Sequence, residues 1–364
     1  MRAYILKHYG GPEGSRLMEV PAPVPGPRDL LVAVRAAGLN PVDFKFRQGK
    51  LRAILRPRLP FVLGNELAGE VIAVGGEVER FRLGDRVFAR VAKDRAGAFA
   101  EQACVDEVDA AHMPRDLDFA AAAAVPLAGL TALQALRDEL DVQPGQKVFI
   151  SGGAGGVGTF AIQIAKWLGG HVTTTASPRG EALVRSLGAD EVIDYTSQDI
   201  SKMGAGFDAG FDLIGGKTLE QMFEIMKPGT KVVSIAALPE PQTAIKDLGG
   251  RRALSAIFWV ISYGIRARAT RRYQLSISFH ASKRSRACSA CRTHRTGKTQ
   301  GHRRQNISVC EHFRRSGLRR KWTRQGKSRC YDELMACPAS SRGRGAPPAL
   351  TARLDSDQTH HALA

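Results

Sequence analysis

The sequence predicts an α/β protein of two domains, a barrel-like β-domain followed by a doubly wound parallel sheet. Short β-like runs broken by glycine and proline fill residues 1–124, which favours a compact all-β domain. Strands alternate with amphipathic helices over residues 125–272, as parallel sheets require. Within this second part an apolar run, 147–150, leads directly into a glycine cluster and then a helix. This order is typical of a chain that wraps the phosphates of a dinucleotide.

The positive charge of the chain is unevenly distributed. Of its 364 residues 43% are hydrophobic, which suits two globular cores, and the formal net charge is +18. Residues 273–364, here called the basic segment, contain 19 of the 53 Lys and Arg but only 5 of the 35 Asp and Glu. They also contain five of the six cysteines. The rest of the chain is therefore close to neutral, and we expect the basic segment to lie outside the two domains.

The glycine cluster has the spacing G-x-G-x-x-G at Gly153, Gly155 and Gly158. In this motif one glycine makes a tight turn, one lets the backbone approach a pyrophosphate, and one lets the helix pack closely. The following helix has an apolar face with residues spaced by three and four. A buried β-turn-α unit without a nucleotide is the alternative. We favour a nucleotide site and expect it to be formed by Gly153, Ala154, Gly155, Gly156, Val157 and Gly158.

The end of the second strand, 171–177, indicates which nucleotide binds. An acidic residue there binds the ribose hydroxyls of NAD, whereas a small residue with a nearby arginine admits the 2′-phosphate of NADP. The chain has Ser177 and Arg179 there and no acid. We therefore predict NADPH as the cofactor, with Ser177 and Arg179 on its phosphate. The alternative for Arg179 is a solvated residue near a helix start.

Two segments of the first domain bear on chemistry: 38–45, with Asn40 and Asp43, and 64–69, with Asn65. Together with the glycine motif they resemble the medium-chain dehydrogenase/reductase superfamily, specifically its zinc-independent quinone oxidoreductase-like branch. The resemblance covers about residues 1–272 and implies a GroES-like substrate-binding domain followed by a Rossmann domain. Zinc-dependent members have a cysteine in place of Asn40 and a histidine in place of Asn65. Because zinc in such proteins is held by thiolate, imidazole and carboxylate groups, we expect no metal.

The resemblance also implies roles for individual residues. Asn40 and Asp43 are the catalytic candidates on the barrel side, Thr131 would face the nicotinamide, and Tyr195 would reach the 2′-phosphate. Alternatives stay open for each. An Asn-Pro-x-Asp run is good turn chemistry, and Asp43 can simply pair with a neighbouring cation. The Thr131 hydroxyl can bond back to its own helix, and Tyr195 can pack at a strand end.

Strand ends farther along the second domain complete the expected site. Parallel sheets bind ligands at the carboxyl ends of their strands, which predicts that the cofactor cleft is lined by Ile214, Gly215, Ile235 and Ala236. An apolar stretch at 253–265 with flanking arginines follows. It is too short to span a bilayer and suits a cleft wall or a subunit interface better than a membrane surface. The sequence therefore leaves open whether the protein forms a homodimer.

The basic segment lacks the sixth parallel strand and the returning strands that the resemblance implies. We hypothesise that it is translated out of frame, because a one-base shift over 326–332 can encode Gly-Lys-Val-Val-Ala-Met, the closing strand expected of the family. Two functional alternatives remain. The spacing of Cys288, Cys291 and His294 fits standard zinc patterns poorly. The arginine-rich run is more typical of a solvated, poorly ordered segment than of a nucleic-acid site.

The leading hypothesis is an NADPH-dependent reductase of quinones or α,β-unsaturated carbonyls that needs no metal. The alternative is a catalytically impaired NADPH-binding or regulatory protein, since a missing sixth strand would remove part of the sheet. No apolar run suggests a signal peptide or a membrane span, so we expect a cytoplasmic protein. The expected partner is a small carbonyl or quinone substrate, without membrane or nucleic acid.

Overall fold

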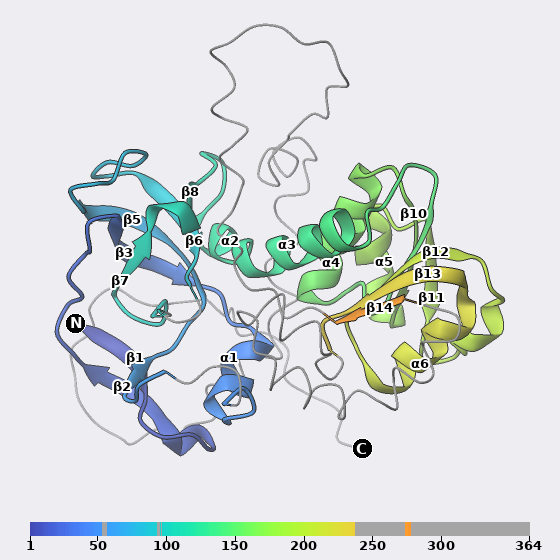
Figure 1. Cartoon of the computed structure of the whole chain (residues 1–364), viewed down its shortest axis with the longest axis horizontal. Helices are drawn as coiled ribbons and strands as arrows, with labels where there is room; N and C mark the ends of the chain where they lie inside the picture. The colour runs from blue at the N-terminus through green and yellow to red at the C-terminus, as the bar shows by residue number, and fades with distance from the viewer. Residues whose placement is uncertain (53–56, 93–94, 96, 237–273, 278–364) are drawn as a thin grey trace, which may run out of the picture.

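The structure is a computed structural model, and it describes residues 1–52, 57–92, 95, 97–236 and 274–277. Two lobes lie side by side, and helices α2 and α3 run between them (Figure 1). The first lobe contains strands β1 to β8, and the second contains the parallel sheet of β9 to β14. The predicted fold class, a β-domain followed by a doubly wound sheet, is therefore confirmed.

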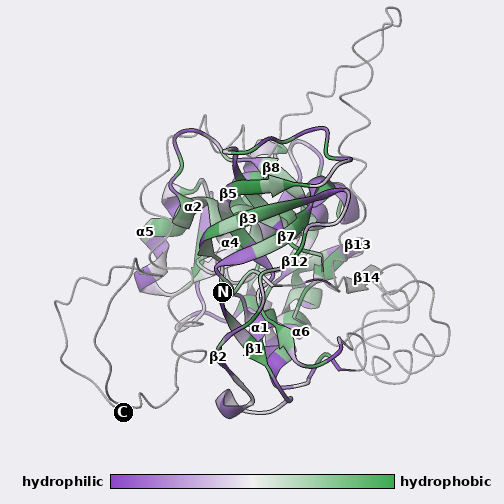
Figure 2. Cartoon of the chain, turned by 90° about the vertical axis from the view of Figure 1, so that its left-hand side faces the viewer, coloured by the Kyte–Doolittle hydropathy of each residue, from purple (hydrophilic) through white to green (hydrophobic). Residues whose placement is uncertain are grey.

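Two antiparallel sheets build the first lobe. The smaller has the strand order β2-β1-β4 and the larger the order β7-β3-β5-β6-β8. Apolar side chains of the larger sheet, such as Leu30, Leu67 and Val87, are fully buried in one core. Hydrophobic colour accordingly follows β3 and β5 in Figure 2. The strands are β1 (Arg2–Leu6), β2 (Ser15–Glu19), β3 (Asp29–Ala37), β4 (Phe61–Val62), β5 (Glu66–Val74), β6 (Arg86–Arg90), β7 (Gln102–Asp106) and β8 (Ala110–His112).

A short helix, α1 (Pro41–Arg47), follows β3 and lies on the inner side of the first lobe (Figure 1). It begins where it does because Asn40 is extended and Pro41 presets the first helical turn. The carboxylate of Asp43 accepts a hydrogen bond from the Asn40 backbone nitrogen at 2.7 Å, which satisfies a free donor of the helix start. Phe46 packs into a small apolar cluster of the lobe. These contacts hold α1 in place beside the second lobe.

The parallel sheet has the strand order β11-β10-β9-β12-β13-β14, the doubly wound order of dinucleotide-binding domains. Its central strand alternates: Val148 and Ile150 pack under α3, α4 and α5, whereas Phe149 packs against α6 on the other face. The strands are β9 (Lys147–Ile150), β10 (His171–Ala176), β11 (Glu191–Asp194), β12 (Phe207–Asp212) and β13 (Met226–Ser234). The helices are α2 (Phe119–Ala123), α3 (Pro126–Leu133), α4 (Gly156–Trp167), α5 (Pro178–Ser186) and α6 (Gly216–Ile225).

Strand β14 (Gln274–Ile277) pairs in parallel with β13, from Lys231 opposite Gln274 to Ser234 opposite Ile277. It takes the sixth position in the sheet, so the expectation that this strand is missing is wrong. A strand of four residues has too few positions to establish a period, and only its pairing with β13 reveals it. The apolar stretch 253–265 and residues 278–364 lie outside the described residues. The out-of-frame, zinc and nucleic-acid hypotheses for the basic segment therefore stay untested.

The central position of β9 leads to a stability prediction. Phe149 is fully buried, and its ring meets that of Phe207 edge-on with centroids 5.3 Å apart. Phe149→Ala leaves a cavity and should lower the free energy of unfolding by about 3–5 kcal/mol. Leu83→Ala is the control, because Leu83 is 70% exposed. Urea unfolding measures both variants; a wild-type midpoint for Phe149→Ala would contradict the placement of β9 in the core.

Candidate functional site

The glycine turn joins β9 to α4 at the carboxyl edge of the parallel sheet. Two of its glycines are required by the fold itself: a Cβ on Gly153 would collide with the Thr174 hydroxyl, and a Cβ on Gly158 with the Gly152 carbonyl oxygen. Gly155 differs, because its φ is an ordinary −77° and the nearest atom to a Cβ there lies 3.3 Å away. A Cβ at 155 would therefore need only a small shift of one backbone oxygen, and the rest of that face of the turn is open.

Helix α4 starts at Gly156, directly after this turn, and no side chain caps it. The first N–H groups of a helix have no partner inside the helix, and the helix dipole favours a negative charge beside them. Gly156, Val157 and Gly158 therefore present backbone donors next to the open face at Gly155. Ala154 packs against Gly180 at the start of α5, where a Cβ on that glycine would lie 2.9 Å from the Ala154 Cβ. This arrangement suits a pyrophosphate.

Three predicted phosphate contacts lie together at the ends of neighbouring strands. Ser177 directly follows β10 and precedes α5, and its side chain makes no capping hydrogen bond. Arg179, in the first turn of α5, is exposed and forms no ion pair with the described residues. Tyr195 directly follows β11 and is 58% exposed, so it is not a buried packing residue. One corner of the sheet thus carries a cation and two hydroxyls that have no side-chain partner among the described residues.

One acid at this corner is Asp194, at the end of β11 and opposite Ala176 of β10. Its carboxylate is occupied locally, since it accepts hydrogen bonds from the Thr196 backbone nitrogen and hydroxyl and from the Ser197 hydroxyl at 3.0, 2.7 and 2.9 Å. These bonds, those from Thr196 foremost, hold the pKa of the Asp194 carboxyl below its usual range. Asp194 therefore organises its own turn, while the end of β10 carries no acid.

A buried carboxylate that we did not single out from the sequence, Asp212, organises the centre of this edge. Ser151 at the end of β9 and Ser234 at the end of β13 donate their hydroxyls to it at 2.9 and 2.6 Å. The backbone nitrogens of Ile214 and Gly215 also donate to it, at 3.1 and 3.0 Å. An acid at the end of an apolar strand, between Phe211 and Leu213, was the available signal.

The turn held by Asp212 carries the remaining predicted contacts of the second lobe. Gly215 has a φ of 79°, a conformation that favours glycine, and Ala236 lies against it at the end of β13. Ile214 is 58% exposed and packs over Gly152 of the glycine turn. Ile235 is half-buried, and its nitrogen donates to the Asp212 carbonyl oxygen at 3.1 Å. The structure thus brings these four residues together beside the glycine turn.

On the first lobe, two amides and two carboxylates form a buried network. Asn40 Nδ2 donates to Glu66 Oε1 at 2.7 Å, and Asn65 Nδ2 donates to Asp43 Oδ1 at 2.5 Å. Asn40 is 4% exposed, Asp43 is 1% exposed and Glu66 is fully buried. Asn40 and Asp43 are therefore hydrogen bonded to the protein itself. They form part of the wall of the candidate site, and Asp43 accepts hydrogen bonds from the Asn65 amide and the Asn40 backbone nitrogen.

Glu66 also reaches across to the helix that leads into the second lobe. Its Oε2 accepts a hydrogen bond from the Leu127 backbone nitrogen at 2.7 Å, in the first turn of α3. Thr131, one turn farther along α3, is half-buried, and its hydroxyl has no hydrogen-bond partner among the described residues. The alternative that this hydroxyl bonds back to its own helix is therefore absent from the structure. Sequence reasoning missed Glu66, although an acid at the start of an apolar strand was a usable signal.

Comparison with known families identifies both lobes. The model of the alcohol dehydrogenase GroES-like domain matches residues 26–115, and that of the family described as zinc-binding dehydrogenase matches residues 156–262. The chain is 34% identical to a chloroplastic quinone oxidoreductase of Triphysaria versicolor, over 66% of this chain and 76% of that protein. It is 39% identical to the chloroplastic NADPH-dependent alkenal/one oxidoreductase of Arabidopsis thaliana, over 66% and 64%.

Solved structures agree with these matches. The quinone oxidoreductase of Coxiella burnetii is 32% identical and has a TM-score of 0.62, with 77% of this chain and 83% of that chain covered. The Escherichia coli quinone oxidoreductase, solved with NADPH, is 26% identical and also has a TM-score of 0.62, with 76% and 80% covered.

The open face at Gly155 gives a prediction about binding. Gly155→Ala should change the melting temperature little, because the methyl group displaces one backbone oxygen, that of Gly152, by only a few tenths of an ångström, but it should raise the Kd for NADPH at least about tenfold by blocking close approach of the pyrophosphate. Gly158→Ala is the matched comparison and should lower the melting temperature, since its methyl group meets backbone atoms. Calorimetry and fluorescence titration check both. Unchanged NADPH affinity in Gly155→Ala would contradict a pyrophosphate at this turn.

Proposed function

Because the chain belongs to the medium-chain dehydrogenase/reductase superfamily, among its quinone oxidoreductase-like members, we propose that it is an NADPH-dependent reductase of quinones or α,β-unsaturated carbonyls that works without a metal. One observation carries the proposal. The open face of the glycine turn lies at the same sheet edge as a free cation, Arg179, and an exposed tyrosine, Tyr195. This combination suits a dinucleotide with an extra phosphate.

The residues of the second lobe fit this cofactor part by part. The backbone of residues 153–158 would hold the pyrophosphate, and Ser177, Arg179 and Tyr195 the 2′-phosphate. Ile214, Gly215, Ile235 and Ala236 would lie along the nicotinamide half, with Thr131 facing it from α3. When bound, NADPH supplies a hydride to an electron-poor carbon. The protein binds NADPH and the substrate, orients them and shields them from water.

The chemistry of the first lobe supports a reaction without metal. Zinc sites in proteins use thiolate, imidazole or carboxylate ligands in tetrahedral geometry. Asn40 and Asn65 are amides, and each donates a hydrogen bond to a buried carboxylate at 2.7 and 2.5 Å. Their nitrogens are thus committed as donors. Asn40 and Asp43 act in this proposal as the barrel-side wall of the site, and solvent supplies the proton.

The cytoplasmic location of the protein stays a prediction. No helix in the described part of the chain is both long and apolar enough to cross a bilayer. Similar proteins include chloroplastic and mitochondrial ones, and the cytoplasmic location expected from the sequence has not been tested. A small quinone or enone is the proposed partner.

Arg179→Ala tests the assignment of the cofactor. Loss of a charge-assisted phosphate contact costs about 1.5–3 kcal/mol, so the Kd for NADPH should rise about 10- to 100-fold, while the Kd for NADH stays nearly constant. Arg185→Ala is the matched control on the same helix, because Arg185 is exposed and pairs with Glu181 at 2.8 Å. Isothermal titration with both cofactors measures the effect. An equal loss for NADPH and NADH would remove the case for a 2′-phosphate contact.

Turnover tests the reaction itself. The purified chain should oxidise NADPH in the presence of 1,4-benzoquinone or a simple enone, and a metal chelator should leave the rate unchanged because no step uses a metal. Absorbance of NADPH follows the reaction. NADPH binding without oxidation across a panel of quinones and enones would favour the alternative of a non-catalytic NADPH-binding protein.

A further inference from the structure

The side chain of Arg90, at the end of β6, lies on the same face of the barrel sheet as the buried network of the site. Arg90 is the cross-strand partner of Glu66 in the pairing of β5 with β6. Side chains of directly opposite residues project from the same face of a sheet. The Glu66 carboxylate on that face reaches Asn40 and the start of α3. Arg90 therefore stands beside the barrel-side wall and the helix that carries Thr131.

The guanidinium of Arg90 is partly buried and lies near three carboxylates. Burial lowers the pKa of its guanidinium, and the carboxylates of Glu66, Asp43 and Asp109 raise it again. An arginine in a protein stays charged at neutral pH. Glu66 and Asp43 are at most 1% exposed, and buried carboxylates without a countercharge are strongly unfavourable. Arg90 thus places a positive charge close to these two buried acids.

The guanidinium of Arg90 keeps donors free for a ligand. Among the described residues its one hydrogen bond runs from Nη1 to the Val91 carbonyl oxygen. Its Nε and Nη2 carry further N–H groups in a rigid fork. The side chain is half-buried, so it is neither sealed in the core nor fully hydrated. Free donors in a partly water-excluded site act strongly on an oxygen that gains negative charge.

We propose that Arg90 donates a hydrogen bond to the carbonyl oxygen of the substrate and stabilises the negative charge that develops there. This inference rests on the proposed function. Hydride addition forms a C–H bond at the electron-poor carbon, NADPH becomes NADP⁺, and the π electrons of the substrate move onto its carbonyl oxygen. A proton from water then completes the product of an enone, on its α-carbon. In a quinone the proton goes to the carbonyl oxygen, and the ring carbon that received the hydride then loses a proton to water while the second carbonyl oxygen gains one, which gives the hydroquinone. Arg90 keeps its own protons throughout.

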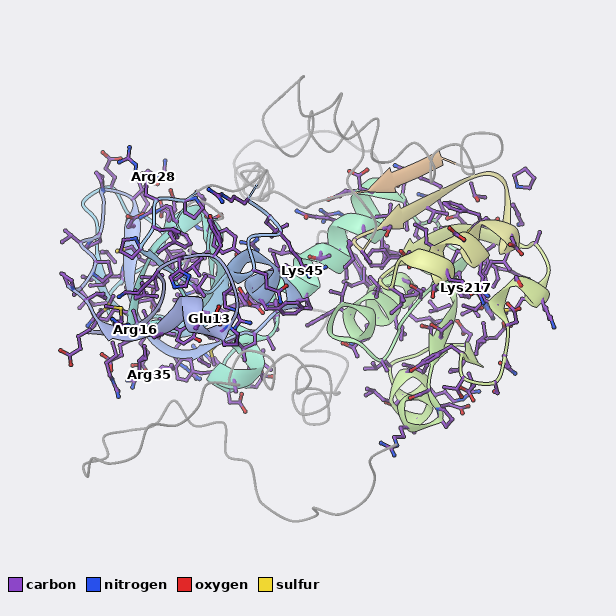
Figure 3. All side chains as sticks on the ribbon, turned by 90° about the horizontal axis from the view of Figure 1, so that it is seen from below. Glu13, Arg16, Arg28, Arg35, Lys45 and Lys217 are labelled. Carbon is purple, nitrogen blue, oxygen red and sulfur yellow. The ribbon has the colours of Figure 1, made fainter. Side chains whose placement is uncertain are left out.

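A second role for Arg90, as a countercharge alone, predicts different kinetics. A countercharge would be replaced by any cation and would act mainly on stability. A donor to the substrate oxygen acts on kcat, and lysine replaces it poorly because it lacks the planar fork. The variants Arg90→Gln and Arg90→Lys separate these roles. Arg35→Gln is the control with the same change of charge: Arg35 pairs with Glu70 at 2.9 Å, and Figure 3 shows it on the outside of the first lobe, away from Lys45 between the lobes.

Turnover with 1,4-benzoquinone gives the first measurement. Arg90→Gln should lower kcat about 10²- to 10³-fold, the usual effect of losing one donor to an oxyanion, with the Kd for NADPH unchanged. Arg90→Lys should also lose at least about tenfold in kcat, and Arg35→Gln should match wild type. The inference is overturned if Arg90→Lys keeps the wild-type kcat and Arg90→Gln loses activity only because it is less stable. Arg90 would then be a countercharge alone.

Binding of 4-nitrophenol gives a second measurement that needs no turnover. In the complex with NADP⁺, wild type should lower the pKa of the bound phenol and so raise the phenolate fraction about tenfold at a fixed pH, and both Arg90 variants should lose this effect. If wild type shows this shift but oxidises no NADPH with any acceptor, the proposed function fails and the oxyanion site stands. If wild type shows no shift, or if either folded Arg90 variant keeps it, the inference is wrong.

Discussion

The carboxylate of Glu66 joins the two halves of this molecule. It is fully buried, and its two oxygens accept one hydrogen bond from Asn40 next to α1 and one from the start of α3. The first bond sets the wall of the barrel lobe, and the second sets the helix that enters the nucleotide lobe. A buried carboxylate that loses its partners costs about 3–5 kcal/mol, so the relative position of these three elements is strongly restrained. The geometry of the site between the lobes depends on this restraint.

Asp212 has the corresponding role at the edge of the parallel sheet. Its carboxylate gathers the hydroxyls of Ser151 and Ser234 and the backbone of the next turn, and thereby aligns the ends of β9, β12 and β13. Ligands of doubly wound sheets bind at these strand ends. The two lobes therefore use the same arrangement, a buried acid whose oxygens are all occupied, to hold backbone segments that line the proposed cofactor and substrate sites. Polar residues of this kind order the site without touching the reacting atoms.

The proposed metal-free chemistry and the buried acids are physically linked. In this chain Asn40 and Asn65 are neutral, and the acids Glu66 and Asp43 beside them are buried. The charge of Arg90 interacts with both. In the proposed reaction this arginine offers hydrogen-bond donors to the substrate oxygen, where a zinc ion would act on it as a Lewis acid. The neutral amides Asn40 and Asn65 and the nearby charge of Arg90 therefore both fit the proposed reaction without a metal.

Local patterns in the sequence determined the two lobes, the glycine turn and the corner formed by Ser177, Arg179 and Tyr195, because periodicity, turn chemistry and the ends of strands depend on residues close in the chain. The tertiary structure alone decided three further points. It placed Glu66 against α3 and Arg90 opposite Glu66, contacts between residues far apart in the chain. It turned Asp43 inward, toward Asn65. It also added β14 to the sheet, since four residues show their role only through the strand beside them.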